Sequence, residues 1–219
     1  MYEEEKKPSA PLLAAFGFVF CVSLALIYFF VAQKPEPIPA PTGFVAYTAK
    51  DQTFKCQAPK DWDREDSGTG GALMASAIFR KGNAKVDITS DLIGSLMGDI
   101  IESGDRQMSG MLPGAMAPQA RPAVEKLHLQ EKAGMKSRIK GYEETEMRAF
   151  TSPLGEAHVS EFTGEKPGFP ASVKVRGYRT TILGNERRVT VLCECPEPDW
   201  SRLKPAFNRV IGSLGPGGA

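Results

Sequence analysis

The four cysteines are the residues of this sequence with the widest range of possible chemistry. Cys56, Cys193 and Cys195 lie in the large C-terminal part of the chain, and the last two share one face of a strand because side chains alternate along β-structure. If their strands are neighbours, Cys56 is a candidate to form a disulfide with Cys193 or Cys195, which an oxidising compartment would favour. Three buried free thiols, packed as small apolar side chains, are the alternative.

A metal or redox site is a further alternative for these cysteines. Met108, Met111 and Met116 lie in a segment rich in glycine and proline, and thioether sulfur beside thiolate suits Cu(I). Methionine in such a segment is more often an adaptable apolar contact. The Cys-x-Cys spacing is a weaker signal than Cys-x-x-Cys, and no histidine stands beside it in the sequence. We therefore expect no cofactor and no bound metal.

The sequence gives little support for catalysis. Only His128 and His158 have side chains that titrate near neutral pH, and we interpret both as ordinary surface or cross-strand residues. The sequence contains no nucleophile elbow, no phosphate-binding loop and no His-x-x-x-His spacing. Glu143 and Glu144 point to opposite faces of a strand, so they cannot share a proton-transfer site. We expect that the protein is not an enzyme.

An uncharged and strongly apolar stretch runs from Leu12 to Gln33. As a helix it would span roughly 33 Å, enough to cross the ~30 Å hydrocarbon layer of a bilayer. The stretch is too long for the core of a cleaved signal peptide, and bulky Phe30 stands where cleavage needs a small residue. We therefore predict a short tail at residues 1–11 and a single transmembrane anchor helix at residues 12–33.

The flanks and faces of this predicted anchor suggest its orientation and its contacts. Two lysines precede it and only Lys34 follows closely, so the positive-inside rule favours an extracytoplasmic C-terminal domain. Gly17, Cys21 and Ala25 lie four residues apart on one helical face. Small residues at this spacing let two helices approach closely, so a homodimer through the transmembrane helix is an alternative to a plain anchor.

The rest of the chain divides into a linker and one domain. Proline recurs at alternate positions between Lys34 and Gly43, which predicts an extended polyproline linker over residues 34–43. Residues 44–215 have the length of one domain, and residues 216–219 form a short tail. A net charge of +1 provides no basic surface for nucleic acid. The expected partners are therefore the lipid bilayer and a second membrane or envelope protein.

Turn signals divide the domain into pairs of alternating strands, which predicts an antiparallel sheet. The predicted hairpins are 43–48 with 53–58, 72–80 with 84–90, 143–150 with 156–163, and 173–183 with 187–195. An apolar stripe from Trp200 to Leu214 predicts an amphipathic helix, and residues 122–136 and 92–101 are further helix candidates. We interpret Arg187 and Arg188 as a solvated strand edge. The prediction is an α+β fold: an N-terminal single transmembrane helix, then an antiparallel β-sheet covered by helices.

The two ends of this domain resemble a known family. An opening extended pair leads to Pro59 and Trp62, and the segment with Trp200 and Phe207 closes the domain. This arrangement resembles the PsbP-like fold, which includes the extrinsic photosystem II subunit and a Ran-binding nuclear transport factor. The resemblance implies a PsbP-like sandwich that is used for docking more often than for catalysis, and it transfers no site residue to this sequence.

The chain as a whole also resembles uncharacterised bacterial membrane-anchored proteins. We therefore expect a single-pass membrane protein that presents a non-catalytic, PsbP-like binding or scaffold domain at the outer membrane face. The alternative is an envelope metal-binding or thiol redox protein that uses Cys56, Cys193 and Cys195.

Overall fold

The computed structural model describes residues 19–23, 36–67, 74–93, 124–168, 172–184 and 187–218. The chain divides into two compact units, residues 1–36 with 168–171, and residues 37–167 with 172–219. In the first unit residues 19–23 are helical, and Cys21 is an exposed free thiol. The rest of the predicted anchor, including Gly17 and Ala25, lies outside the described residues. Within the described residues, no helix has the length and apolar character needed to cross a bilayer.

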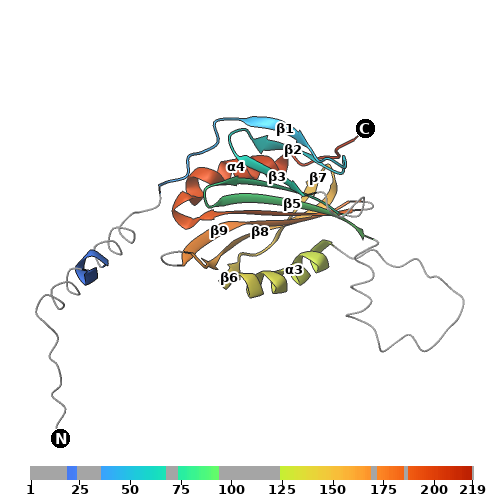
Figure 1. Ribbon diagram of the computed structural model, residues 1–219. Helices are drawn as coiled ribbons and strands as arrows, with labels where there is room; N and C mark the ends of the chain where they lie inside the picture. The colour runs from blue at the N-terminus through green and yellow to red at the C-terminus, as the bar shows by residue number, and fades with distance from the viewer. Residues whose placement is uncertain are drawn as a thin grey trace, which may run out of the picture. The chain divides into compact units, whose positions relative to one another are not determined.

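An antiparallel sheet forms the centre of the second unit (Figure 1). Among the described residues the strand order is β3-β4-β5-β10-β9-β8-β6, and β7 also pairs with β8. The strands are β3 (Asp63–Ser67), β4 (Met74–Lys81), β5 (Ala84–Leu92), β6 (Lys140–Glu144), β7 (Arg148–Ser152), β8 (Gly155–Lys166), β9 (Val173–Leu183) and β10 (Arg187–Pro196). A separate two-stranded sheet consists of β1 (Phe44–Thr48) and β2 (Lys55–Pro59).

The antiparallel sheet confirms the hairpin pattern of the sequence, with three differences. The predicted strand 143–150 is two strands, β6 and β7, which both pair with β8 and are separated by residues 145–147. The interpretation of Arg187 and Arg188 as a strand edge was wrong, because β10 lies in the interior of the sheet between β5 and β9. Strand β3 was not predicted.

Two helices cover opposite faces of the sheet (Figure 1). Helix α4 (Trp200–Gly212), which follows the short helix η2 (Glu197–Asp199), contacts β2 on one side and β9 and β10 on the other. Helix α3 (Val124–Arg138) lies on the other face, over β6, β8 and β9. The third predicted helix, 92–101, lies almost entirely outside the described residues.

The main apolar core lies under α4 and confirms the stripe read from the sequence. Trp200 is 6% exposed and packs against the rings of Tyr178 and Phe207, with ring centroids 5.0 and 6.0 Å away. The β1–β2 sheet closes this core from outside. The fully buried side chains of the main core include Phe54, Val86, Ile88, Ile182, Val191, Cys193, Leu203, Phe207, Val210 and Leu214.

The segment before β1 is attached to this core. Ile38 is 7% exposed, its backbone N–H donates to Asp199 Oδ1 at 3.2 Å, and its carbonyl accepts from Arg202 at 2.8 Å. The Asp199 carboxylate also pairs with Arg202 at 2.9 Å. A side chain within the predicted linker is therefore held at the start of α4.

Candidate functional site

The face of the sheet under α3 carries a group of polar side chains beside two small apolar clusters, whereas the face under α4 carries the main apolar core. Register places Ser160 of β8 opposite Arg179 of β9, and Thr181 of β9 opposite Thr190 of β10. These side chains project to the same side because they occupy matching positions in the pleat. Three neighbouring strands therefore supply polar groups to one surface, which α3 partly covers.

The most deeply buried ion pair on this surface joins Arg179 of β9 to Glu144 of β6. Arg179 Nε donates to Glu144 Oε1 at 2.6 Å and Nη2 donates to Oε2 at 3.2 Å, while 2% of each side chain is exposed. Burial raises the pKa of Glu144, but the hydrogen bonds from Arg179 and Tyr142 outweigh it and hold that pKa below its ordinary value. Arg179 Nη1 also donates to the backbone carbonyl of His128 at 2.6 Å, so the pair ties α3 to the sheet.

Glu131 of α3 is the second centre of charge on this surface. Its Oε1 accepts from Thr190 at 3.2 Å and pairs with Arg188 Nη1 at 3.0 Å. Its Oε2 accepts from Thr181 at 3.2 Å and pairs with Arg179 Nη1 at 3.5 Å. Two guanidinium groups and two hydroxyl groups therefore hold this carboxylate in one position.

His128 lies deeper under α3, and it is fully buried. Its Nδ1 lies 3.0 Å from Thr181 Oγ1 and its Nε2 lies 2.9 Å from Ser160 Oγ. Because Thr181 donates its one hydroxyl hydrogen to Glu131, its oxygen accepts from Nδ1–H, and Nε2 accepts from Ser160. Burial first, and then the charge of Arg179, lower the pKa of His128 to about 4. The interpretation of this residue as an ordinary surface or cross-strand histidine was wrong.

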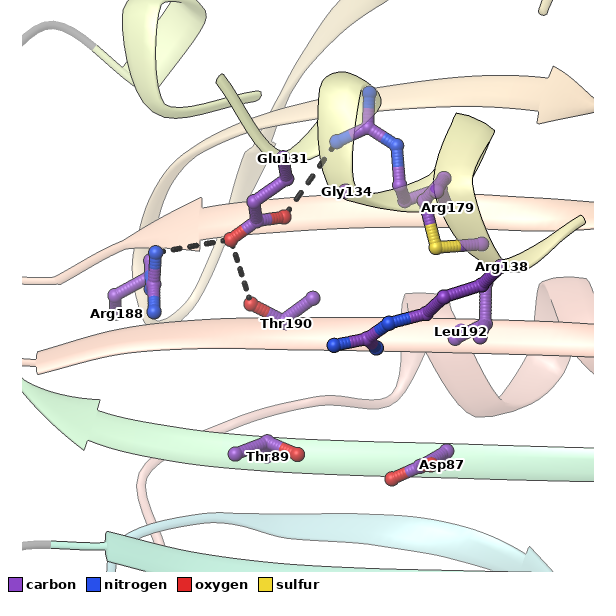
Figure 2. A pocket seen from close by; sticks show the side chains of 10 residues that line it. Asp87, Thr89, Glu131, Gly134, Arg138, Arg179, Arg188, Thr190 and Leu192 are labelled. Atoms are coloured by element: carbon purple, nitrogen blue, oxygen red, sulfur yellow. Dashed lines mark hydrogen bonds and ion pairs between the residues drawn. The ribbon is translucent and has the colours of Figure 1, made fainter. Parts of the chain in front are cut away.

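A pocket of about 380 Å³ opens beside this network, between α3 and strands β5, β9 and β10 (Figure 2). Its lining residues are Asp87, Thr89, Glu131, Gly134, Met135, Arg138, Arg179, Arg188, Thr190 and Leu192. In Figure 2 the side chain of Arg138 extends from α3 into the pocket, and no dashed line joins it to another residue. Asp87 is paired with Lys85 at 3.1 Å. The pocket therefore combines a fixed network of paired charges with one cation, Arg138, that has no partner among the described residues.

The three cysteines of the domain lie elsewhere, in the apolar core under α4. Cys56, Cys193 and Cys195 are buried free thiols, and Cys56 belongs to the separate β1–β2 sheet. Burial raises the pKa of Cys56 to about 12 and raises that of Cys193 well above its ordinary value. Burial, with the negative charges of Asp199 and Glu194, raises the pKa of Cys195 to about 12. These thiols are packed as small apolar groups.

The described residues hold no group of three or more histidine, cysteine or acidic side chains suited to a metal ion. The methionines proposed as further ligands, Met108, Met111 and Met116, lie outside the described residues. His158 lies near His128, with ring centroids 6.2 Å apart, but its buried Nδ1 has no hydrogen-bond partner in the described part of the chain.

Sequence reasoning did not identify the residues that form the polar network. Glu144 was considered only as a neighbour of Glu143, and Arg179 was treated as part of an alternating strand. A usable signal was present in three strands, since 158 and 160, 179 and 181, and 188 and 190 are all polar at period two. Such a repeated polar face, opposite an apolar one, indicates a surface that another polar element covers.

A comparison with known proteins shows which fold this chain has. No family model and no curated protein matches the chain. The solution structure of CyanoP, the cyanobacterial PsbP of Synechocystis sp. PCC 6803, matches with a TM-score of 0.52 at 10% identity, over 84% of this chain and 96% of that chain. The fold is PsbP-like. The resemblance read from the two ends of the domain is thus confirmed at the level of the fold.

Two further solved structures match the PsbP-like domain less well. One is PA94, a protein of unknown function from Pseudomonas aeruginosa, at 10% identity and TM-score 0.43, over 81% of this chain and 99% of that chain. The other is LpqN, which is involved in cell envelope biogenesis of Mycobacterium tuberculosis, at 12% identity and TM-score 0.42, over 78% and 89%. At these identities the likeness concerns the fold alone.

Proposed function

We propose that this protein is a membrane-anchored, non-catalytic binding module and that the pocket beside α3 is its binding site. One observation carries the proposal: the pocket is preformed, because paired neighbours fix the charged groups that line its inner wall. Glu131 is held by Arg179 and Arg188, and Asp87 by Lys85. A rigid cavity of this volume binds a small ligand without a large ordering cost.

The chemistry of the nearby groups favours binding over catalysis. A general base works best when its pKa lies near the operating pH, whereas His128 has a pKa of about 4 and both of its ring nitrogens are hydrogen-bonded. The domain thiols have raised pKa values, so little reactive thiolate forms at neutral pH. Both features support a site that holds its ligand unchanged.

The membrane anchor in this proposal depends on the apolar stretch from Leu12 to Gln33 and the lysines before it. We propose that the PsbP-like domain lies outside the cytoplasm, where the bilayer and a membrane or envelope protein are its neighbours. The alternative, a metal-binding or thiol redox protein that uses Cys56, Cys193 and Cys195, has less support because these thiols are buried in the apolar core.

Gly134 offers a way to test the pocket without disturbing the fold. A Cβ atom added at this exposed helical position meets nothing within 4 Å, so Gly134→Trp places a bulky ring at the pocket wall without a backbone clash. Ala133→Trp is the matched control, because Ala133 is exposed on the same helix and does not line the pocket.

The experiment screens small anionic, neutral and cationic molecules for binding to the purified full-length protein by ligand-observed NMR. We expect at least one molecule that binds the wild type and Ala133→Trp but not Gly134→Trp, and that is recovered chemically unchanged. The absence of any molecule sensitive to Gly134→Trp would contradict the proposed site. Conversion of a ligand by the wild type but not by Gly134→Trp would contradict a non-catalytic role.

A further inference from the structure

Among the described residues, the charges around the pocket leave one cation without a partner. Each carboxylate there is matched: Glu144 by Arg179 and Lys132, Asp91 by Arg188, and Glu194 by Lys166 and Lys85. Glu131 and Asp87 are paired as described above. Arg138 alone among the lining charges makes no ion pair or hydrogen bond within the described part of the chain.

Two hydrogen-bond donors at the pocket also have no acceptor among the described residues. Arg188 Nε has no partner within the described residues but is buried out of reach of a ligand, and the other two nitrogens of that guanidinium are paired. The Thr89 hydroxyl likewise has no hydrogen-bond partner in the described part of the chain. Thr89 is half-buried in the pocket wall, so its hydroxyl group can donate to an oxygen of a ligand there.

We propose that the pocket binds a small organic anion, whose carboxylate or phosphate group pairs with Arg138 and accepts from the Thr89 hydroxyl. This inference rests on the proposed function, in which the same pocket is the binding site. A guanidinium is suited to such groups because its N–H donors match two oxygens at once. A cationic ligand is disfavoured, since Glu131 and Asp87 already have their counter-charges.

The other residues that line the pocket, and its volume, limit the size and polarity of the rest of the ligand. Leu192 and Met135 line the pocket and provide apolar surface for a short carbon skeleton. The volume of about 380 Å³ lies at the lower end of the range for small-molecule sites, which limits the ligand to the size of a small metabolite or a lipid headgroup. The shared chemistry is an acidic group next to a few carbon atoms.

The test measures affinity by isothermal titration calorimetry with the full-length protein. The probes are acetate, succinate, citrate, inorganic phosphate and glycerol 3-phosphate, with acetamide, succinamide and glycerol as neutral counterparts. The variants are Arg138→Met, Arg138→Gln and Arg138→Lys. Arg148→Met is the matched control, because Arg148 is an exposed arginine on β7 that does not line the pocket.

We expect at least one anion to bind the wild type and Arg148→Met more tightly than its neutral counterpart does. Its affinity should fall about tenfold or more in Arg138→Met and Arg138→Gln, because a charge-assisted pair is lost. Arg138→Lys should recover part of the affinity. The midpoint of thermal unfolding should be unchanged in the three Arg138 variants, since Arg138 makes no ion pair or hydrogen bond within the described residues.

Each other outcome is informative. Equal affinity for an anion and its neutral counterpart, or an affinity unaffected by Arg138→Met, would overturn the anion proposal. If Gly134→Trp still abolishes binding in that case, the pocket remains a binding site. No binding of any probe would overturn the anion proposal, and the broader screen then decides the proposed function. Vesicles of phosphatidylglycerol and phosphatidylcholine identify the source: stronger Arg138-dependent binding to phosphatidylglycerol than to free glycerol 3-phosphate indicates a lipid headgroup.

Discussion

Arg179 and Glu144 form a two-point ion pair that closes the polar layer between α3 and the sheet, with 2% of each side chain exposed. Tyr142 donates its hydroxyl to the same carboxylate, and Arg179 also holds the carbonyl of His128. One buried pair thus connects β6, β9 and α3. Arg179 of this pair also lines the pocket.

Removal of one partner should be costly. Arg179→Met leaves the Glu144 carboxylate buried without its main counter-charge, and we expect a loss of about 3–5 kcal/mol in the free energy of unfolding. Urea denaturation followed by circular dichroism measures this loss. The double variant Arg179→Met with Glu144→Met should lose less than Arg179→Met alone. An equal or larger loss in the double variant would contradict the assignment of the cost to an unpaired charge.

The stability of the folded protein should fall in acid because His128 has a lowered pKa. The pKa of His128 is about 4 in the folded protein, below the ordinary value of about 6.5. Between these two values the unfolded chain is protonated at this residue and the folded chain is not. The associated stability is fully present above about pH 6.5 and is lost as the pH falls towards 4, by roughly 3 kcal/mol in total. Midpoints of urea denaturation, measured across this pH range, test the expected loss of stability. His128→Asn should flatten this part of the profile, whereas His158→Asn should keep it.

Trp200 should be the main anchor of α4. Trp200→Ala removes a buried ring that packs against Tyr178 and Phe207, and a loss of about 3–5 kcal/mol is usual for such a truncation. Asn208→Ala, an exposed change on the same helix, is the control and should stay within about 0.5 kcal/mol. A loss below about 1 kcal/mol for Trp200→Ala would show that the helix packs differently.

The domain thiols should be unreactive until the protein unfolds. Cys56, Cys193 and Cys195 are buried with raised pKa values, so iodoacetamide at about pH 8 should not modify them in the folded protein. In urea without a reductant all three should react, as peptide mass spectrometry can follow. If only one of the three reacts under these conditions, a disulfide has formed.

The sequence predicts local features of this fold well. Alternation and turn residues identified most strands, and the stripe from Trp200 to Leu214 identified α4, because each signal lies within one short segment. Strand β3 was missed since Asp63, Arg64 and Glu65 show no apolar alternation. As an edge strand it is fixed by pairing with β4 rather than by burial.

The site could not be predicted in the same way. Glu131, Glu144, Arg179 and Arg188 lie on a helix and three different strands, and only sheet order and register bring them together. The same limit explains the wrong interpretation of Arg188. A local pattern of two arginines cannot reveal whether a strand is at the edge or in the interior.

The attachment of Ile38 beside Asp199 sets the reach of the domain. From Gln33 to Ile38 the chain can extend by at most about 18 Å, less than half the distance available if the chain were free as far as Phe44. If residues 12–33 cross a bilayer as proposed, the domain searches only a thin layer next to that surface. A short tether raises the effective concentration of anything held on the same surface. Weak affinity in the pocket would then be sufficient for a ligand at the membrane, whereas the same affinity would be ineffective in bulk solution.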